Sequence, residues 1–171
     1  CAGCATPIGV DRADPLVVQR QLAANAINAG VPSPTSAQVL RRSGLYEAWS
    51  RDPEGVLRTL HGRLADDGQE GLLFALAELS YLHATATGDR RHYLAALVYA
   101  YARLFPGEGT SGPSAPWDPR VRATYDLYNR SLAAAFGEDE SPRVVFRAGR
   151  HELPFGTLDL ELAPPREWAG Y

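Results

Sequence analysis

The stretch 69–106 constrains the fold of this 171-residue chain most strongly. It holds two dense apolar runs, 72–86 and 93–105, with Gly88 and Asp89 between them. Gly88 can end a helix because glycine takes a positive φ without a Cβ clash, and Asp89 can cap the next helix. A connection this short makes the two helices antiparallel neighbours. Apolar residues run nearly all round both helices, which predicts burial on several sides.

Helical patterns before and after this pair predict four more helices. Three of them open with Asp-Pro, in which the aspartate caps the helix and the proline takes the first helical position, where no N–H is needed. The fourth is expected to begin with a capping box of Thr35 and Gln38, and Ser43-Gly44 can break it into two pieces. The six predicted helices cover roughly 14–30, 35–49, 52–65, 69–86, 89–105 and 118–136.

From Arg143 the apolar period changes from about 3.6 residues to two. We predict a short strand at 144–147, a turn at 148–150 and a second strand region at 153–162, with the leucines of 157–162 facing inward. An isolated two-stranded hairpin is only marginally stable in water. We therefore expect this hairpin to join a following sheet.

The predicted fold class is mostly α, with about six helices packed as antiparallel helical hairpins and a C-terminal β-hairpin. A hydrophobic fraction of 45% and a charged fraction of 22% are ordinary for a globular domain. We divide the chain into a lipobox remnant and tether (1–13), a helical domain (14–137) and a hairpin region that starts a downstream domain (138–171). The sequence contains no methionine, so we expect it to be part of a longer protein.

The charge distribution argues against nucleic acid as a partner. The net charge is −3, and all 17 basic residues are arginines that are scattered among acidic residues. Binding to phosphates needs a concentrated positive face. The sequence also has no run of 18 apolar residues, the length that a membrane-spanning helix requires.

Both cysteines lie within the first four residues, as Cys1-Ala2-Gly3-Cys4. A C-x-x-C can be a redox pair, but it then stands at a helix start beside a βαβ unit. It can supply half of a zinc site, but the chain has no second cysteine pair. Ala-Gly-Cys instead resembles a bacterial lipobox, so we predict acylation at Cys4, with Cys1 as the alternative. Cys1 stands where a lipobox usually has leucine. Acyl chains would anchor the protein to a membrane.

No catalytic, metal-binding or cofactor-binding motif is apparent. The nearest approach to the G-x-S-x-G elbow of serine hydrolases is the segment 109–112, which lacks the spacing and lies in a Gly/Pro-rich loop. No phosphate-binding loop of the Walker or Rossmann type is present. We predict no catalytic residue and no cofactor within this chain.

The four histidines are candidates for functional residues. His83 and His92 flank the hairpin turn with Asp89 and could form a metal cluster, but their positions are more simply those of exposed or half-buried helix ends. His61 has no partner pattern such as H-E-x-x-H. His151-Glu152 follows the predicted β-turn, and we interpret it as surface.

Six tyrosines fall at helical spacing and are predicted to fill helix–helix seams. A ligand groove lined by them is the alternative. They are Tyr81, Tyr93, Tyr99, Tyr101, Tyr125 and Tyr128. The hairpin 75–106 that carries four of them resembles one tetratricopeptide-type unit, although no neighbour repeats it at the expected period.

A second resemblance covers most of the chain. Its motifs are Gly3-Cys4-Ala5-Thr6-Pro7-Ile8-Gly9-Val10, Phe74-Ala75-Leu76-Ala77-Glu78-Leu79-Ser80, Tyr93-Leu94-Ala95-Ala96, Asp126-Leu127-Tyr128-Asn129-Arg130 and Leu153-Pro154-Phe155-Gly156-Thr157. These segments are similar to the N-terminal part of a group of bacterial lipoproteins of the α/β-hydrolase type, in which a helical region precedes the hydrolase domain. The resemblance implies an envelope location, lipidation at Cys4 and ester-hydrolase activity in the parent protein. It supplies no catalytic residue here, because the serine, acid and histidine would lie beyond Tyr171.

Together these observations predict a non-catalytic accessory or spacer region of a lipid-anchored envelope protein, on the periplasmic side of the outer or inner membrane. Its expected partners are the membrane, through the lipid anchor, and the downstream domain. The alternative is a tetratricopeptide-like module that binds a protein partner.

Overall fold

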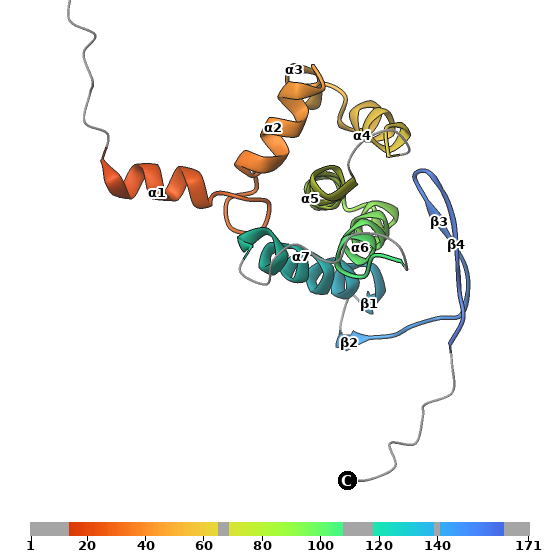
Figure 1. The fold of residues 1–171 in the computed structure, drawn as a ribbon. Coiled ribbons are helices and arrows are strands. Elements are labelled where there is room, and N and C mark those ends of the chain that lie inside the picture. The colour runs from red at the N-terminus through yellow and green to blue at the C-terminus, as the bar shows by residue number, and fades with distance from the viewer. Residues whose placement is uncertain (1–13, 65–68, 108–117, 139–140, 163–171) are drawn as a thin grey trace, which may run out of the picture.

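The computed structural model describes residues 14–64, 69–107, 118–138 and 141–162, and this part of the chain is mostly helical, as the sequence predicts (Figure 1). The predictions for 1–13, including Cys1 and Cys4, and for the segment 109–112 lie outside the described residues. The elements are α1 (Pro15–Ala23), α2 (Pro34–Arg42), α3 (Tyr46–Trp49), α4 (Pro53–Gly62), α5 (Gln69–Thr87), α6 (Arg90–Leu104), α7 (Pro119–Phe136), β1 (Gly137–Glu138), β2 (Ser141–Val144), β3 (Gly149–Leu153) and β4 (Gly156–Leu160).

Helix α5 is the centre of the fold. Helices α2, α4, α6 and α7 all pack against it, and Figure 1 shows them arranged around it. Leu76 and Leu79 are fully buried on α5, and each such side chain stabilises the fold by about 1.5–3 kcal/mol. The predicted antiparallel pair of α5 and α6 is confirmed. Gly88 turns the chain with φ +74°, and the carboxylate of Asp89 accepts a hydrogen bond from Arg91 N at 2.9 Å.

A buried carboxylate ties α5 to the connection between α1 and α2. Glu78 is 1% exposed. Its Oε1 accepts a hydrogen bond from Ala26 N at 3.0 Å, and its Oε2 accepts one from Ser33 N at 3.1 Å. The hydroxyls of Ser33 and Ser36 also donate to Oε2. Because hydrogen bonds to a charged group are directional and strong, Glu78 determines where the 26–36 segment lies on the core.

The Asp-Pro helix starts are confirmed at α1, α4 and α7, where Asp14, Asp52 and Asp118 cap the first turn with their side chains. The predicted capping box of α2 is wrong. Its N-cap is Ser33, whose side chain accepts a hydrogen bond from Ser36 N. Pro34 explains the difference, because proline suits the first helical position and moves the cap one residue before it.

The described residues form seven helices instead of the six predicted. The additional helix arises at the anticipated break, where Gly44 takes φ +69° and separates α2 from α3. Helix α1 also ends at Ala23 and not near Gly30. The side chain of Asn25 accepts from the backbone N–H of Ile27 and of Asn28, at 2.8 and 3.1 Å. These local bonds satisfy the backbone without a helix.

The strand boundaries differ from the prediction. The 144–147 segment is a strand only at Val144, the end of β2, and 148–150 is not the hairpin turn. The antiparallel hairpin is formed by β3 and β4, and Pro154-Phe155 makes its turn. Proline sets the φ that the first turn position needs. Strands β1 and β2 form a second, separate antiparallel pair.

One face of the β3–β4 hairpin packs on the helices, as the alternating leucines predict. Leu153, Leu158 and Leu160 contact a cluster of Leu94, Leu97 and Phe136. Leu162, which was also expected to face inward, is 51% exposed. Within the described residues, the hairpin pairs with no further strand. Its expected extension into a larger sheet stays a prediction.

Candidate functional site

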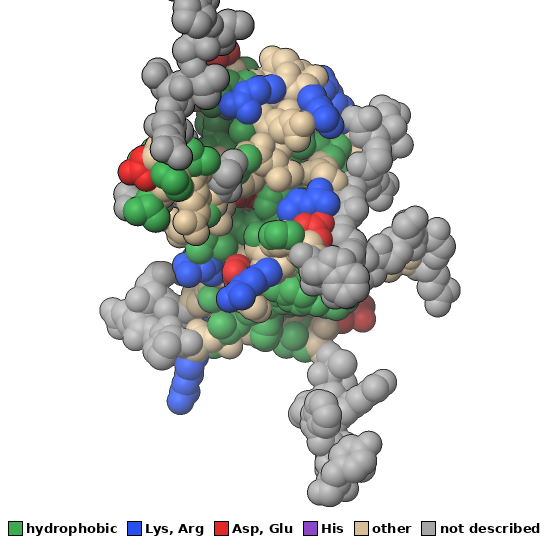
Figure 2. All heavy atoms as spheres, turned by 60° about the vertical axis from the view of Figure 1, so that its left-hand side comes forward, with side chains coloured by type: hydrophobic (Ala, Val, Ile, Leu, Met, Phe, Trp, Pro, Cys, Tyr) green, Lys and Arg blue, Asp and Glu red, His purple; other side chains and the backbone are tan. Residues whose placement is uncertain are grey.

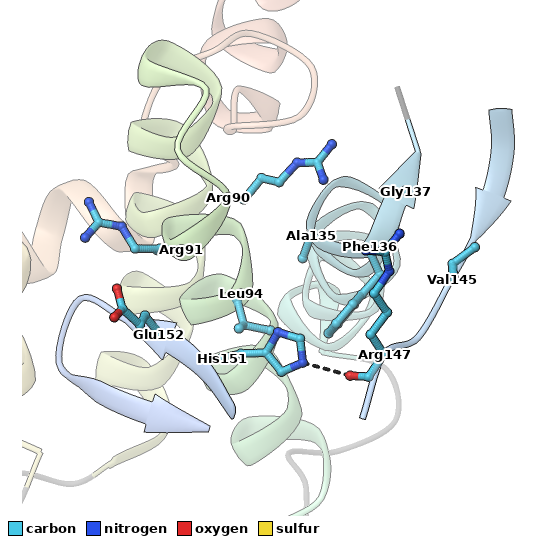
Figure 3. Close-up of a pocket in the computed structure, with 10 residues that line it drawn as sticks. All are labelled: Arg90, Arg91, Leu94, Ala135, Phe136, Gly137, Val145, Arg147, His151 and Glu152. Atoms are coloured by element: carbon cyan, nitrogen blue, oxygen red, sulfur yellow. Dashed lines mark hydrogen bonds between the residues drawn. The ribbon is translucent and has the colours of Figure 1, made fainter. Parts of the chain in front are cut away.

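Two cavities lie beside the β3–β4 hairpin, and α6 contributes to the walls of both. We name the first the arginine cleft. It has a volume of about 540 Å³ and lies between the start of α6, the end of α7 and strand β3 (Figure 3). Its lining residues are Arg90, Arg91, Leu94, Ala135, Phe136, Gly137, Val145, Arg147, His151 and Glu152.

The arginine cleft is basic, but its charged groups do not meet at one point. In Figure 3, Arg90 and Arg91 leave α6 in different directions. The Arg91 guanidinium forms an ion pair with Asp89, with Nη2 2.8 Å from Oδ2, and hydrogen bonds from Arg91 hold the pKa of Asp89 below its usual value. His151 Nε2 makes a hydrogen bond of 2.8 Å with the carbonyl oxygen of Arg147. The cleft therefore lacks the convergent geometry of a dedicated anion site.

We name the second cavity the histidine pocket. It has a volume of about 390 Å³ and is formed by α4, α5, α6 and the turn of the β3–β4 hairpin. This volume is within the range of small-molecule sites, about 300–1,000 Å³. Its lining residues are Glu54, Leu57, Arg58, His61, Ser80, His92, Ala95, Tyr99, Pro154 and Phe155.

Three aromatic rings form one wall of the histidine pocket. His61 Nδ1 lies 2.9 Å from the hydroxyl oxygen of Tyr99, so the two side chains share a hydrogen bond. The ring of Phe155 stacks on His61 with centroids 4.4 Å apart and lies 5.0 Å from the ring of Tyr99. Burial raises the pKa of Tyr99 far above its ordinary value, so its hydroxyl stays protonated at neutral pH.

His92 and Ser80 supply the buried polar part of the pocket lining. They are 3% and 1% exposed. Burial lowers the pKa of His92, and the nearby ring of His83 lowers it further. His92 is therefore neutral at pH 7. Among the described residues, its Nδ1 atom has no hydrogen-bond partner.

The pocket lining contains one serine and two histidines, the residue types of a nucleophile and its base. A serine nucleophile needs a base within hydrogen-bond reach. His61 uses Nδ1 for Tyr99, and Nδ1 of His92 has no partner, so neither of these atoms activates Ser80. The described residues also contain no group of three or more His, Cys, Asp or Glu side chains placed to hold a metal ion.

The histidines agree with the sequence interpretation only in part, since His83 is half-buried as expected. His83 and His92 do meet, with rings 4.4 Å apart and edge to face, but His92 is buried and not at an exposed helix end. His151 lies within β3 and not after a turn. The role of His61 was missed, because its partners Tyr99 and Phe155 are distant in the sequence. Only the aromatic Phe155, beside Pro154 at a hairpin turn, could have signalled it.

The tyrosines divide between core and surface. Tyr99 is buried, and the ring of Tyr81 packs edge-on against Tyr93 at 5.6 Å. Tyr101 and Tyr125 are 54% and 46% exposed. Only Tyr99 lines either of the two hairpin cavities. The tyrosine-lined groove is therefore reduced to one tyrosine in the histidine pocket.

The surface carries mixed charges. On the face that Figure 2 shows, arginine side chains are interspersed with acidic and hydrophobic ones, and no continuous basic surface forms there. No described helix has the length and apolar character needed to cross a bilayer. Comparisons of the chain with protein-family models, curated proteins and solved structures give no match.

Proposed function

We propose that this chain is the non-catalytic accessory and spacer region of a lipid-anchored bacterial envelope protein, with Cys4 as the acylated residue. The helical body would hold a following domain of the α/β-hydrolase type at a distance from the membrane. Ester hydrolysis would belong to that domain and not to the residues described above.

The observation that carries this proposal is the position of α1. Leu16 and Val17 on this helix are 60% and 45% exposed, and no other helix or strand of the described chain packs extensively against it. Figure 1 shows α1 extending away from the body. The helix follows the Cys4 tether directly. Its apolar side chains suit the membrane interface, where they would add to the binding free energy of the acyl chains.

The β3–β4 hairpin supports the second half of the proposal. In Figure 1 it lies on the opposite side of the helical body from α1. Its outward face is polar, with Arg150 and Asp159 exposed and joined by an ion pair of 3.3 Å. An unpaired strand edge is a template for a further strand. A following domain would thus attach at the end of the body that is farthest from the tether.

The tetratricopeptide-like alternative receives less support from the packing. A repeat pair binds its partner on an open concave face. Here α2, α4, α6 and α7 surround α5, and Tyr99 is 4% exposed. The α5–α6 pair is therefore the core of a closed helical domain.

Metabolic labelling tests the anchor. The chain would be produced in a bacterial host behind a cleavable lipoprotein leader and labelled with radioactive palmitate. The parent chain and Cys1→Ser should incorporate label and sediment with membranes. Cys4→Ser should lose both the label and the membrane fraction. Label retained by Cys4→Ser and lost by Cys1→Ser would move the anchor to Cys1, and label in neither single variant or in all of them would contradict the assignment.

A further inference from the structure

The lining of the histidine pocket defines what kind of molecule it can hold. Its deepest side chains are neutral at pH 7, because burial lowers the pKa of His92 and raises that of Tyr99. The charged residues Glu54 and Arg58 are largely exposed and face each other at 3.6 Å. An ionic ligand in the buried part of the pocket would lose its hydration, and the two charged side chains at the exposed rim are already paired with each other. The pocket therefore selects against ions.

The volume and the lining of the histidine pocket favour a ligand that contains a ring. A cavity of about 150 Å³ is already enough to bind benzene, so the 390 Å³ of the histidine pocket can hold a single substituted ring. Leu57, Ala95 and Tyr99 are all under 10% exposed and form an apolar wall. The ring of Phe155 at the hairpin turn stacks on the ring of His61 of α4, with centroids 4.4 Å apart. The stacked pair presents an aromatic surface to a ligand ring.

His61 supplies the polar contact. Its Nδ1 is held by Tyr99 at 2.9 Å, which orients the imidazole and leaves Nε2 as the nitrogen available for a ligand. If the Tyr99 hydroxyl donates to Nδ1, Nε2 carries the proton and donates to a ligand carbonyl. If Nδ1–H donates to Tyr99, Nε2 accepts from a ligand hydroxyl. Either tautomer therefore offers one hydrogen bond to a neutral group.

We propose that the histidine pocket binds a small neutral molecule with one ring and one hydroxyl or carbonyl group, the ring lying against Phe155 and Tyr99 and the polar group on His61 Nε2. This site is separate from the proposed anchoring function. It does not depend on Cys4 or on a following domain, and either proposal can fail without the other.

Binding of three probes to the 171-residue chain tests the proposal. The probes are p-cresol, toluene, which lacks the hydroxyl, and 4-methylbenzoate, which is anionic. Titrations would be followed by NMR. The signals observed are those of the imidazole nitrogens and of the protons bound to the ring carbons. We expect saturable shifts at His61 with p-cresol, weaker binding of toluene and none of 4-methylbenzoate. No saturable shift at His61 with p-cresol, or tighter binding of 4-methylbenzoate, would overturn the proposal.

Variants distinguish binding in the histidine pocket from unspecific binding elsewhere on the protein. His61→Phe keeps a ring beside Phe155 but removes the hydrogen bond, so p-cresol should bind about fivefold more weakly while toluene is unaffected. Binding to this variant would be followed at the imidazole signals of His92, which lines the same pocket. His151→Phe makes the same change in the arginine cleft and should leave both affinities unchanged. Equal effects of the two variants would contradict the assignment to His61.

A second pair of variants covers the case in which His61→Phe perturbs the fold. Ala95→Val adds volume inside the histidine pocket and should weaken both p-cresol and toluene. Ala135→Val adds the same volume to the arginine cleft and should weaken neither. Unchanged binding of both probes to Ala95→Val in a folded chain would exclude the pocket as the binding site.

Discussion

Glu78 and His92, two of the ionisable side chains that the central helix pair buries, differ in their hydrogen bonding. Glu78 on α5 is 1% exposed and His92 on α6 is 3% exposed. The Glu78 carboxylate accepts hydrogen bonds from four donors of the 26–36 segment. Nδ1 of His92 has no partner among the described residues. Both oxygens of Glu78 therefore have hydrogen-bond donors, whereas Nδ1 of His92 lacks a partner among the described residues.

This difference in hydrogen bonding distinguishes a residue with a structural role, Glu78, from a residue of a binding site, His92. Apolar contacts along α5 are non-directional and do not by themselves determine where the α1–α2 connection lies. Glu78 does determine the position of this connection, because its hydrogen-bond partners must approach from defined directions. An unsatisfied buried nitrogen destabilises a fold by about 1–3 kcal/mol. His92 is such a group, and it lies in the lining of the histidine pocket.

The largest expected effect comes from removing the satisfied group. Glu78→Ala leaves the N–H groups of Ala26 and Ser33 and two serine hydroxyls without an acceptor. We expect the free energy of unfolding to fall by at least about 3 kcal/mol, measured by urea denaturation. The exposed Glu47 of α3 is the control, and Glu47→Ala should change stability by less than about 0.5 kcal/mol. Equal effects of the two substitutions would mean that Glu78 contributes nothing specific.

A smaller effect is expected at one of the donors. Ser36 is fully buried, and its hydroxyl donates to Oε2 of Glu78. Ser36→Ala should lower the free energy of unfolding by about 1.5–3 kcal/mol, the usual range for a hydrogen bond to a charged group. Ser36→Thr keeps the hydroxyl and should recover part of the loss. A Ser36→Ala variant as stable as the parent would show that the remaining donors suffice for Glu78.

The sequence predicted the local features of this contrast and missed the distant ones. Gly88 and the Asp-Pro pairs act through backbone conformation within a few residues, so the turn and three helix starts were recognisable. Glu78 looks like a single polar residue in an apolar run. Its partners Ala26 and Ser33 are 52 and 45 residues away, and no periodicity reports such a pairing.

The same limit applies to the histidine pocket. His61 and Tyr99 lie 38 residues apart, and Phe155 reaches them only because the hairpin turns at Pro154-Phe155 and not at 148–150. A shift of the turn along the strand changes which side chains it presents to α4 and α6. The pocket could therefore not be assembled from the predicted hairpin.

The unsatisfied histidine should make stability depend on pH. The pKa of His92 is lowered in the folded chain, so the unfolded chain binds the proton first as the pH falls. Stability is then fully present above the unfolded pKa of about 6.5 and decreases below it, by about 1.4 kcal/mol for each unit of depression. Urea denaturation between pH 7.5 and 5 would show a shallower pH dependence for His92→Phe. Parallel curves for the two proteins would contradict this role of His92.

The smallest expected effect on stability distinguishes the contribution of burying a serine from that of its hydrogen bond. Ser131 on α7 is as fully buried as Ser36, but its hydroxyl has no hydrogen-bond partner among the described residues. Ser131→Ala removes an unsatisfied polar atom and introduces the better helix former, so stability should change by less than about 0.5 kcal/mol or increase. The measurement is urea denaturation beside Ser36→Ala under identical conditions. Equal losses in the two variants would mean that filling the space matters at both sites and that the hydrogen bond to Glu78 does not. A loss confined to Ser36→Ala would assign the stabilisation to the carboxylate, because both serines are fully buried in a helix and only the Ser36 hydroxyl has an acceptor.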